Sequence, residues 1–238
     1  MSFLNINSLN KQFNEQLILN IITPEYTGAV GEVADEIINL GDVAIKSGTF
    51  LFQLRNKNIS GKDLYYIAVK LVKYFSLYGC GKNEVIINKP IVIINDRADV
   101  AALAGADGVH IGDDDLPLPY IKKIYPQLIT GVSVKNPDEA KKAEAEGADY
   151  IGAGSVFNTS SKSDAGKPLG ADMLTKICDS VKIPVIAIGG INLDNVKTII
   201  NTGIKGVAVI SAVAGAEDQL DAAKKFNNIK TKNKNKKL

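Results

Sequence analysis

The residues best suited to chemistry follow short apolar runs, at the points where buried strands would end. After the run Thr49–Leu54, the side chains of Gln53, Arg55 and Lys57 fall on one side of an extended chain, because side chains alternate along a strand. Two cations in this arrangement suit a polyanion such as a diphosphate. The alternative is an ordinary solvated strand end.

Carboxylates follow the next two apolar runs. Asn95 and Asp96 end one run, and three carboxylates, Asp113, Asp114 and Asp115, follow another. Carboxylate oxygens are the ligands of Mg²⁺, which takes one or two of them together with substrate phosphates. The same residues could instead cap the helices that follow, and for Asp115 the two roles are compatible. His110, the single histidine, is interpreted as a positioned structural side chain rather than a base.

Two kinds of segment suit a phosphate. Gly189–Gly190 and Ile210–Ser211 end two further runs, and backbone amides of such turns, leading into helix N-termini, can hold one phosphate group. The segment Asn158–Ser163 surrounds the ammonium of Lys162 with hydroxyl groups, which also suits a phosphate. The alternative for this segment is a mobile, solvated surface loop.

Apolar runs and amphipathic stretches alternate about eight times, at roughly 25-residue spacing, which predicts a single (β/α)8 TIM barrel. The runs are almost continuously apolar, as in strands buried on both faces. A doubly wound sheet normally has fewer strands and a glycine-rich first turn, which is absent here. The expected strands are Leu17–Ile22, Thr49–Leu54, Ile91–Ile94, Gly108–Ile111, Leu128–Val132, Tyr150–Ala153, Pro184–Ile188 and Gly206–Ile210. The expected helices are Gly31–Lys46, Lys62–Leu77, Ala98–Ala104, Leu116–Tyr125, Pro137–Glu146, Ala171–Val181, Leu193–Asn201 and Glu217–Phe226.

The chain is therefore expected to form one catalytic barrel over residues 16–226, preceded by an N-terminal extension (1–15) and followed by a basic, disordered tail (227–238). Residues 82–90 are either an extra strand or a long connection. The net charge is +2, but five tail lysines account for more than this, so the rest of the chain carries −3. A slightly acidic body argues against a nucleic-acid-binding surface.

Composition also bears on location. No run reaches the ~18 apolar residues of a membrane span, and the polar N-terminus does not match a signal peptide. The two cysteines, Cys80 and Cys178, fit free thiols in a reducing compartment. We therefore expect a cytoplasmic protein without a membrane partner.

In a barrel of this kind, chemistry lies where the strands end, so these polar residues are expected to share one mouth. One anion site would be the backbone turns after the seventh and eighth strands, suited to a monophosphate. The other would gather cations and carboxylates suited to a Mg²⁺-bound diphosphate. The two together predict a transferase that joins two phosphorylated small molecules.

The chain resembles the thiamine phosphate synthase (thiamine-phosphate pyrophosphorylase) family over roughly residues 18 to 226. The resemblance rests on QLRNK (53–57), INDR (94–97), GADGVHIGDDDLP (105–117), GVSVKNPDEA (131–140), GADYIGAGSVFNTSSK (147–162), AIGGI (187–191) and GVAVISA (206–212). It implies a transferase in which the nitrogen of hydroxyethylthiazole phosphate replaces the pyrophosphate of hydroxymethylpyrimidine diphosphate, with Mg²⁺ as cofactor. It leaves a homodimer open.

The resemblance also implies a role for individual residues. Gln53, Arg55, Lys57, Asn95 and Lys162 would hold the pyrimidine diphosphate; Asp96 and Asp115 would bind Mg²⁺; Ser133 would lie near the leaving group; Thr159 and Ser161, with the backbones of Gly190, Ile210 and Ser211, would bind the thiazole phosphate. Ser133 and Lys162 would be the catalytic residues.

The chain departs from the family pattern at three positions. Asp113 stands where glutamine is usual, and Ser155 and Asn158 stand where prolines are usual. Without these prolines, the loop 158–163 is expected to be flexible when empty and to close over bound diphosphate. Three alternatives compete with a synthase: a thiazole tautomerase-like isomerase, a non-catalytic thiamine-precursor binding protein, and a barrel isomerase or aldolase. The retained cations and carboxylates at the strand ends disfavour the tautomerase, which needs neither diphosphate nor metal.

Overall fold

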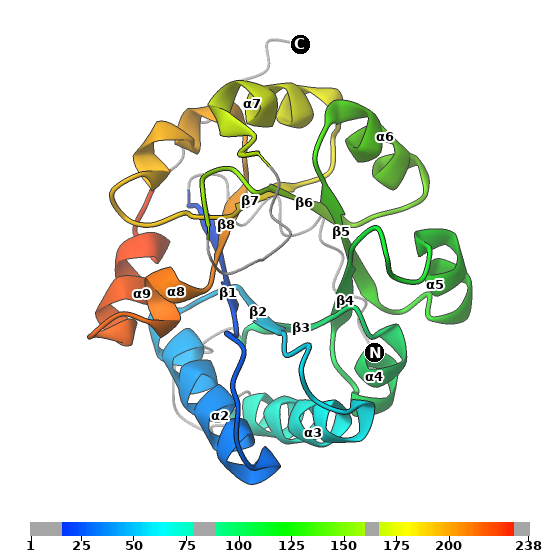
Figure 1. The fold of residues 1–238 in the computed structure, drawn as a ribbon, viewed down its shortest axis with the longest axis vertical. Coiled ribbons are helices and arrows are strands. Elements are labelled where there is room, and N and C mark those ends of the chain that lie inside the picture. The colour runs from blue at the N-terminus through cyan, green and yellow to red at the C-terminus, as the bar shows by residue number, and fades with distance from the viewer. Residues whose placement is uncertain (1–15, 79–88, 160–166, 231–238) are drawn as a thin grey trace.

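Eight parallel strands close into a barrel in the order in which they occur along the chain (Figure 1). The computed structural model describes residues 16–78, 89–159 and 167–230. The strands are β1 Ile18–Ile22, β2 Leu51–Leu54, β3 Ile91–Asn95, β4 Gly108–Ile111, β5 Ile129–Val134, β6 Tyr150–Gly154, β7 Val185–Ile188 and β8 Gly206–Val209. Pairing of β8 with β1 closes the ring. The predicted (β/α)8 barrel is thus confirmed.

Helices surround the barrel on the outside (Figure 1). They are α2 Val30–Ser47, α3 Gly61–Tyr78, α4 Ala98–Ala104, α5 Leu118–Ile124, α6 Pro137–Ala145, α7 Gly170–Ser180, α8 Ser211–Ala214 and α9 Gln219–Asn227, with two short 3₁₀ helices, η1 Val196–Thr198 and η2 Ile200–Thr202. Among the described residues, none of these helices is both long and apolar enough to cross a membrane.

The α-helix predicted over Leu193–Asn201 is wrong, because η1 and η2 lie there instead. Polar side chains compete for the backbone groups that a helix would use. The side chain of Asn192 accepts hydrogen bonds from the N–H groups of residues 194 and 195, and Thr198 Oγ1 donates to the carbonyl of Asn195. Such local side-chain bonds favour turns over a regular helix.

The ends of the described chain come together beside the barrel. Helix α9 ends at Asn227, one residue beyond the predicted barrel boundary. Lys230 then forms an antiparallel bridge with Gln16, and the N–H of Leu17 donates to the carbonyl of Ile229. The predicted N-terminal extension, the segment 82–88 and the remainder of the basic tail lie outside the described residues.

Two separate apolar clusters hold the barrel together. The larger one lies between the outer faces of the strands and the helices. The smaller one lies inside the barrel and consists of Ile22, Leu51, Ile91, Ile93, Ile129, Tyr150, Ile186 and Ala208. Because side chains alternate along each strand, every strand except β4 contributes to both clusters. The inner cluster forms the floor on which the polar residues of the mouth rest.

A repeated aspartate anchors two strands at the opposite end of the barrel. Asp107 accepts a hydrogen bond from the N–H of Val92, and Asp149 accepts one from the N–H of Thr130. Both belong to the repeated sequence Gly-Ala-Asp, in which the glycine has a positive φ at the end of the preceding helix. The repeat therefore marks a recurrent helix-to-strand junction.

Glycine makes room for two rings inside the barrel. A Cβ on Gly131 would lie 2.2 Å from Cζ of Tyr150 and 2.4 Å from Nδ1 of His110. A Cβ on Gly152 would meet Cε1 of His110 at 3.0 Å. Real Cβ atoms do not approach neighbours as closely as the Gly131 values, so the rings depend on this glycine.

We predict that Gly131→Ala destabilises the protein by about 1–3 kcal/mol or more, because buried rings cannot move aside cheaply. Urea unfolding followed by circular dichroism measures the change. Gly31→Ala in α2 is the control, since a Cβ there meets nothing within 4 Å. Equal unfolding midpoints for both variants would show that the interior has spare room at Gly131.

Candidate active site

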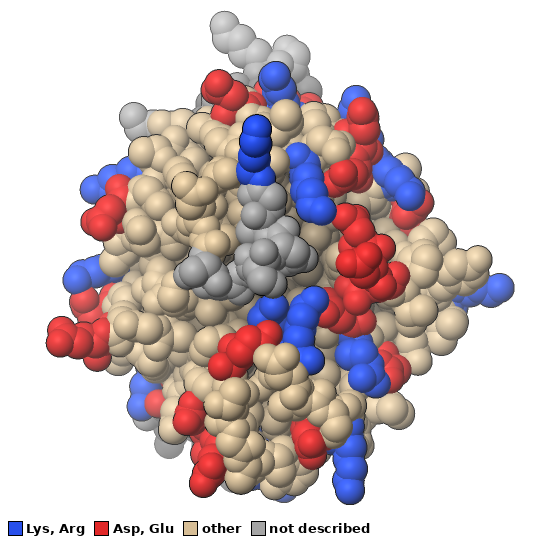
Figure 2. All heavy atoms as spheres, in the orientation of Figure 1, with Lys and Arg blue, Asp and Glu red and all other residues tan. Residues whose placement is uncertain are grey.

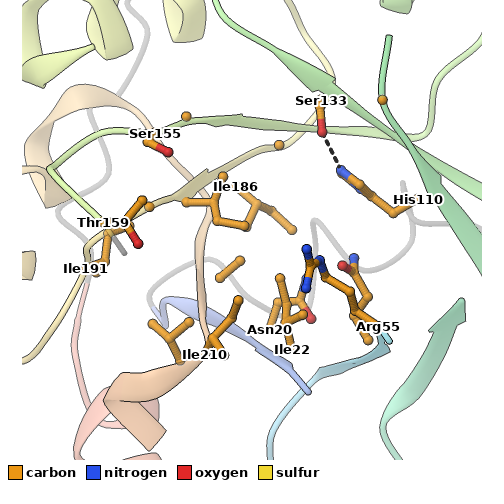
Figure 3. Close-up of a pocket in the computed structure, with 18 of the residues that line it drawn as sticks. Asn20, Ile22, Arg55, His110, Ser133, Ser155, Thr159, Ile186, Ile191 and Ile210 are labelled. Atoms are coloured by element: carbon orange, nitrogen blue, oxygen red, sulfur yellow. Dashed lines mark hydrogen bonds between the residues drawn. The ribbon is translucent and has the colours of Figure 1, made fainter. Parts of the chain in front are cut away.

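A cavity of about 700 Å³ opens where the strands end, and residues of all eight strands line it. Among the residues predicted from the sequence, those that line the cavity are Gln53, Arg55, Lys57, Asn95, Asp96, Asp115, Ser133, Thr159, Gly190, Ile210 and Ser211. Figure 3 shows Ser133 and His110 on one side and Thr159 and Ile191 on the other. Ser161, Lys162 and the part of the predicted closing loop beyond Thr159 lie outside the described residues.

The segment after β2 is held by the loop that follows β1. The guanidinium of Arg55 forms an ion pair with Glu25, whose other carboxylate oxygen accepts the N–H of Lys57 at 2.9 Å. The hydroxyl of Thr23 donates to the carbonyl of Arg55 at 2.7 Å and accepts its N–H at 2.9 Å. Arg55 and Lys57 therefore enter the mouth on a rigid segment.

Two carboxylates meet beside these cations. Lys57 Nζ lies 3.1 Å from Oδ2 of Asp96, a residue whose φ of 64° is a left-handed conformation that aspartate tolerates better than most side chains. Burial raises the pKa of the Asp115 carboxyl to about 6. A hydrogen bond to Asp96 and repulsion by its charge add to this rise, whereas the N–H of Gly112 opposes it.

This pair has the chemistry that Mg²⁺ requires. Two carboxylates close enough to share a proton leave negative charge that a divalent cation would neutralise. Among the described residues, no group of three or more histidine, cysteine, aspartate or glutamate side chains is placed to hold a metal ion. The donor set therefore fits a cation that takes its remaining ligands from water and substrate phosphates rather than from a closed protein cage.

Neither Asp96 nor Asp115 caps the helix that follows it, so the alternative interpretation of these residues is wrong. Helix α5 has Pro117 at its N-cap and α4 has Arg97, and neither cap makes a side-chain hydrogen bond. Instead, Asp115 Oδ2 accepts the N–H of Gly112 at 2.7 Å, which closes the turn after β4. Acidic and basic side chains are interspersed on this face of the molecule (Figure 2).

A chain of hydrogen bonds crosses the floor of the cavity. Gln53 hydrogen-bonds to the hydroxyl of Tyr150, whose pKa is raised by burial, so the phenol keeps its proton. The Tyr150 hydroxyl lies 3.1 Å from Nδ1 of His110, and Nε2 of His110 lies 3.0 Å from Oγ of Ser133 (Figure 3). If Tyr150 donates to Nδ1, then Nε2 carries the histidine proton and donates to Ser133. The Ser133 hydroxyl can then donate its own proton into the cavity.

The glycine turn after β7 forms the opposite corner of the cavity. Gly189 and Gly190 have φ values of 100° and 65°, and a Cβ on Gly190 would lie 2.2 Å from the carbonyl oxygen of Asn158. The N–H of Phe157 donates to the carbonyl of Gly189, so the segment that carries Thr159 packs against this turn. Of the two turns expected to lead into helix N-termini, the one after β8 does so, into the short α8. The turn after β7 does not, since η1 begins only at Val196.

Sequence reasoning missed four residues of this site: Asn20, Thr23, Glu25 and Tyr150. Thr23 and Glu25 follow the first apolar run, and their position after a strand was a usable signal. Asn20 interrupts an apolar strand, which also marks it. Nothing local distinguishes Tyr150, because its partner His110 is 40 residues away.

Comparison with known proteins agrees with this geometry. The family model described as thiamine monophosphate synthase matches residues 19–213. This chain belongs to that family. The thiamine-phosphate synthase of Coprothermobacter proteolyticus is 43% identical over 215 residues, which cover 90% of this chain and 95% of that protein. The thiamine-phosphate synthase of Pyrococcus horikoshii is 42% identical and covers 87% and 91%, respectively.

A solved structure extends this agreement to three dimensions. Thiamine phosphate pyrophosphorylase from Pyrococcus furiosus superposes with a TM-score of 0.71 at 39% sequence identity. The superposition covers 88% of this chain and 93% of that structure. The barrel that contains this cavity is therefore similar to the Pyrococcus furiosus structure in both sequence and shape.

We predict that the imidazole of His110 is in the Nε2–H tautomer. Because the chain has one histidine, its ¹⁵N spectrum contains a single imidazole spin system. Tyr150→Phe removes the donor to Nδ1 and should shift the tautomer balance, whereas Tyr120→Phe on the exposed surface of α5 should not. An Nδ1–H imidazole in the unmodified protein would reverse the direction of the hydrogen-bond chain.

Proposed function

We propose that this chain joins hydroxymethylpyrimidine diphosphate to hydroxyethylthiazole phosphate, forming thiamine phosphate and releasing pyrophosphate. The observation that carries the proposal is one cavity with two chemically different corners. Cations and paired carboxylates lie at β2–β4, and a glycine turn with hydroxyl-bearing residues lies at β7–β8. Between them, Ile22, Ile186 and Ile188 give the cavity an apolar stretch of wall. A diphosphate and a monophosphate can therefore be held apart while two rings meet in the middle.

Charge balance supports a cation in the diphosphate corner. Asp96 and Asp115 would repel a diphosphate, and the positive charge of Arg55 is already paired with Glu25. Mg²⁺, when bound, would neutralise this repulsion and stabilise the charge of the departing pyrophosphate. Asp96 and Asp115 would hold it, and Lys57 would contact the phosphate oxygens beside it.

The reaction itself needs no proton transfer at the thiazole nitrogen. The carbon–oxygen bond to the diphosphate breaks, and the nitrogen lone pair forms the new carbon–nitrogen bond. Ser133, oriented by His110, would donate a hydrogen bond to the leaving group. The apolar walls would exclude water, which would otherwise capture the pyrimidine carbon. His110 would act by position and not as a base.

The thiazole phosphate would bind at the opposite corner. Thr159 would donate its hydroxyl, and the backbone of Gly190, Ile210 and Ser211 would supply further donors. Ser161 at this corner and Lys162 at the pyrimidine diphosphate stay predictions from the sequence. Cytoplasmic location and a homodimer also stay predictions. A tautomerase would have no use for the cations and carboxylates of the diphosphate corner, so their presence favours the synthase.

We predict that Asp115→Asn lowers the rate of pyrophosphate release at least about 100-fold, because metal-assisted charge stabilisation contributes several kcal/mol. Circular dichroism should show an unchanged fold. Asp114→Asn is the matched control, an exposed carboxylate in the same turn, and should retain most activity. Full activity of Asp115→Asn, or of the unmodified protein in the presence of a chelator, would remove the metal from the scheme.

We predict that Lys57→Ala weakens binding of the pyrimidine diphosphate about tenfold or more, as expected when one charge-assisted contact is lost. Binding of the thiazole phosphate should change little, because its corner lies across the cavity. Lys135→Ala removes a lysine paired with Asp113 on the same rim and serves as the control. Titration calorimetry with each ligand measures both effects, and equal losses for both ligands would indicate a single shared anion site.

A further inference from the structure

Asn20 has a buried polar atom that finds no partner in the part of the chain that the structure describes. It lies in β1 and is 2% exposed, and its Oδ1 forms no hydrogen bond with any described residue. Its side chain lines the cavity (Figure 3), where it lies near Ile22 on the β1 wall. A buried carbonyl oxygen without a donor costs about 1–3 kcal/mol, so such atoms are normally satisfied. The position facing the cavity indicates that the missing donor comes from a bound molecule.

The surroundings of Asn20 fit a ring rather than a phosphate. In the strand register, Asn20 is paired with Leu51 on one side and Ala208 on the other. Ile22 follows on the same strand, and Ile186 is part of the same inner cluster. Apolar walls around one or two amide groups are typical of sites for small aromatic molecules. Phosphate oxygens are acceptors and would not satisfy Oδ1.

Only one of the two substrates can supply the donor. The thiazole ring of hydroxyethylthiazole phosphate carries no N–H group, and its phosphate is anchored elsewhere in the scheme. The pyrimidine substrate carries a ring amino group with two N–H donors. On the basis of the proposed function, we propose that Asn20 accepts a hydrogen bond from this amino group and thereby determines which pyrimidine the enzyme accepts.

Gln53 does not make Asn20 redundant. The Gln53 side chain already hydrogen-bonds to Tyr150, and Tyr150 in turn contacts His110. Part of the hydrogen-bonding capacity of the Gln53 side chain is therefore used within the protein. Asn20 keeps an unused acceptor for the ligand. A substrate without the amino group would leave that acceptor buried and unpaired, which is the situation that gives polar sites high selectivity.

The test compares two substrates in two proteins. The ligands are the natural pyrimidine diphosphate and an analogue in which hydrogen replaces the ring amino group, each titrated with Mg²⁺ and without thiazole phosphate. We expect the unmodified enzyme to bind the amino compound on the order of 100-fold more tightly. Binding is measured as Kd by calorimetry, since the amino group also changes the intrinsic rate of carbon–oxygen bond cleavage. Asn20→Leu, which keeps the branching at Cγ but lacks the acceptor, should reduce this preference to a few-fold. The KM for thiazole phosphate should stay within about twofold.

Ile22→Leu is the matched control, because it changes the shape of the same wall without altering hydrogen bonding. This variant should weaken binding of both pyrimidine diphosphates equally and keep the preference for the amino compound. If Asn20→Leu weakens both pyrimidine diphosphates equally, so that the preference is unchanged, the inference is wrong and Oδ1 binds a structural water instead. No turnover by the unmodified enzyme with the natural pair would instead contradict the proposed function.

A second measurement does not depend on activity. Removing a buried, unsatisfied acceptor should stabilise the ligand-free protein, so the thermal midpoint of Asn20→Leu should exceed that of the unmodified protein. The same variant should lose the stabilisation that added pyrimidine diphosphate gives the unmodified protein. If Asn20→Leu does not fold, Asn20→Ala removes the same oxygen without adding a branched side chain. Equal stabilisation by the ligand in either folded variant would contradict the role of Asn20.

Discussion

The limited space inside the barrel determines where the chemistry lies. Large side chains can point inward only where a neighbouring strand offers glycine, as Gly131 does for the rings of His110 and Tyr150. Isoleucine and leucine fill the remaining floor. As a result, polar side chains collect at the carboxyl ends of the strands. The hydrogen-bond chain that ends at Ser133 is held between these two layers, so the same packing that closes the core also orients a group of the site.

Charge arrangement then divides the mouth into two corners. The diphosphate corner has carboxylates next to cations, with Asp96 beside Lys57 and Glu25 beside Arg55. Such a corner binds a polyanion well only together with a further cation, which links metal and substrate binding. Among the described residues, the glycine corner has no such carboxylate pair and presents backbone and hydroxyl groups instead. In the proposed function, this difference would allow one cavity to hold two anionic substrates without exchanging them.

The sequence predicted those features that depend on local patterns. The two-residue period of a strand brought Gln53, Arg55 and Lys57 to one side, and the order of the elements placed them with Asp96 and Asp115 at one mouth. Contacts that depend on strand register were not predictable. Arg55 meets Glu25 across 30 residues, and His110 meets Tyr150 across 40. The helix expected over residues 193–201 also failed, since local bonds of Asn192 and Thr198 outweighed the apolar pattern. The orphan oxygen of Asn20 became visible only with its surroundings.

In the proposed function, both substrates bind in one cavity and react there with each other. A single-turnover reaction with enzyme in excess over hydroxymethylpyrimidine diphosphate tests it most directly, with thiamine phosphate, pyrophosphate and free hydroxymethylpyrimidine quantified over time. We expect equal amounts of thiamine phosphate and pyrophosphate, little free hydroxymethylpyrimidine, and dependence on both thiazole phosphate and Mg²⁺. Isomerisation of a thiazole phosphate alone, without formation of thiamine phosphate from the pair, would contradict it.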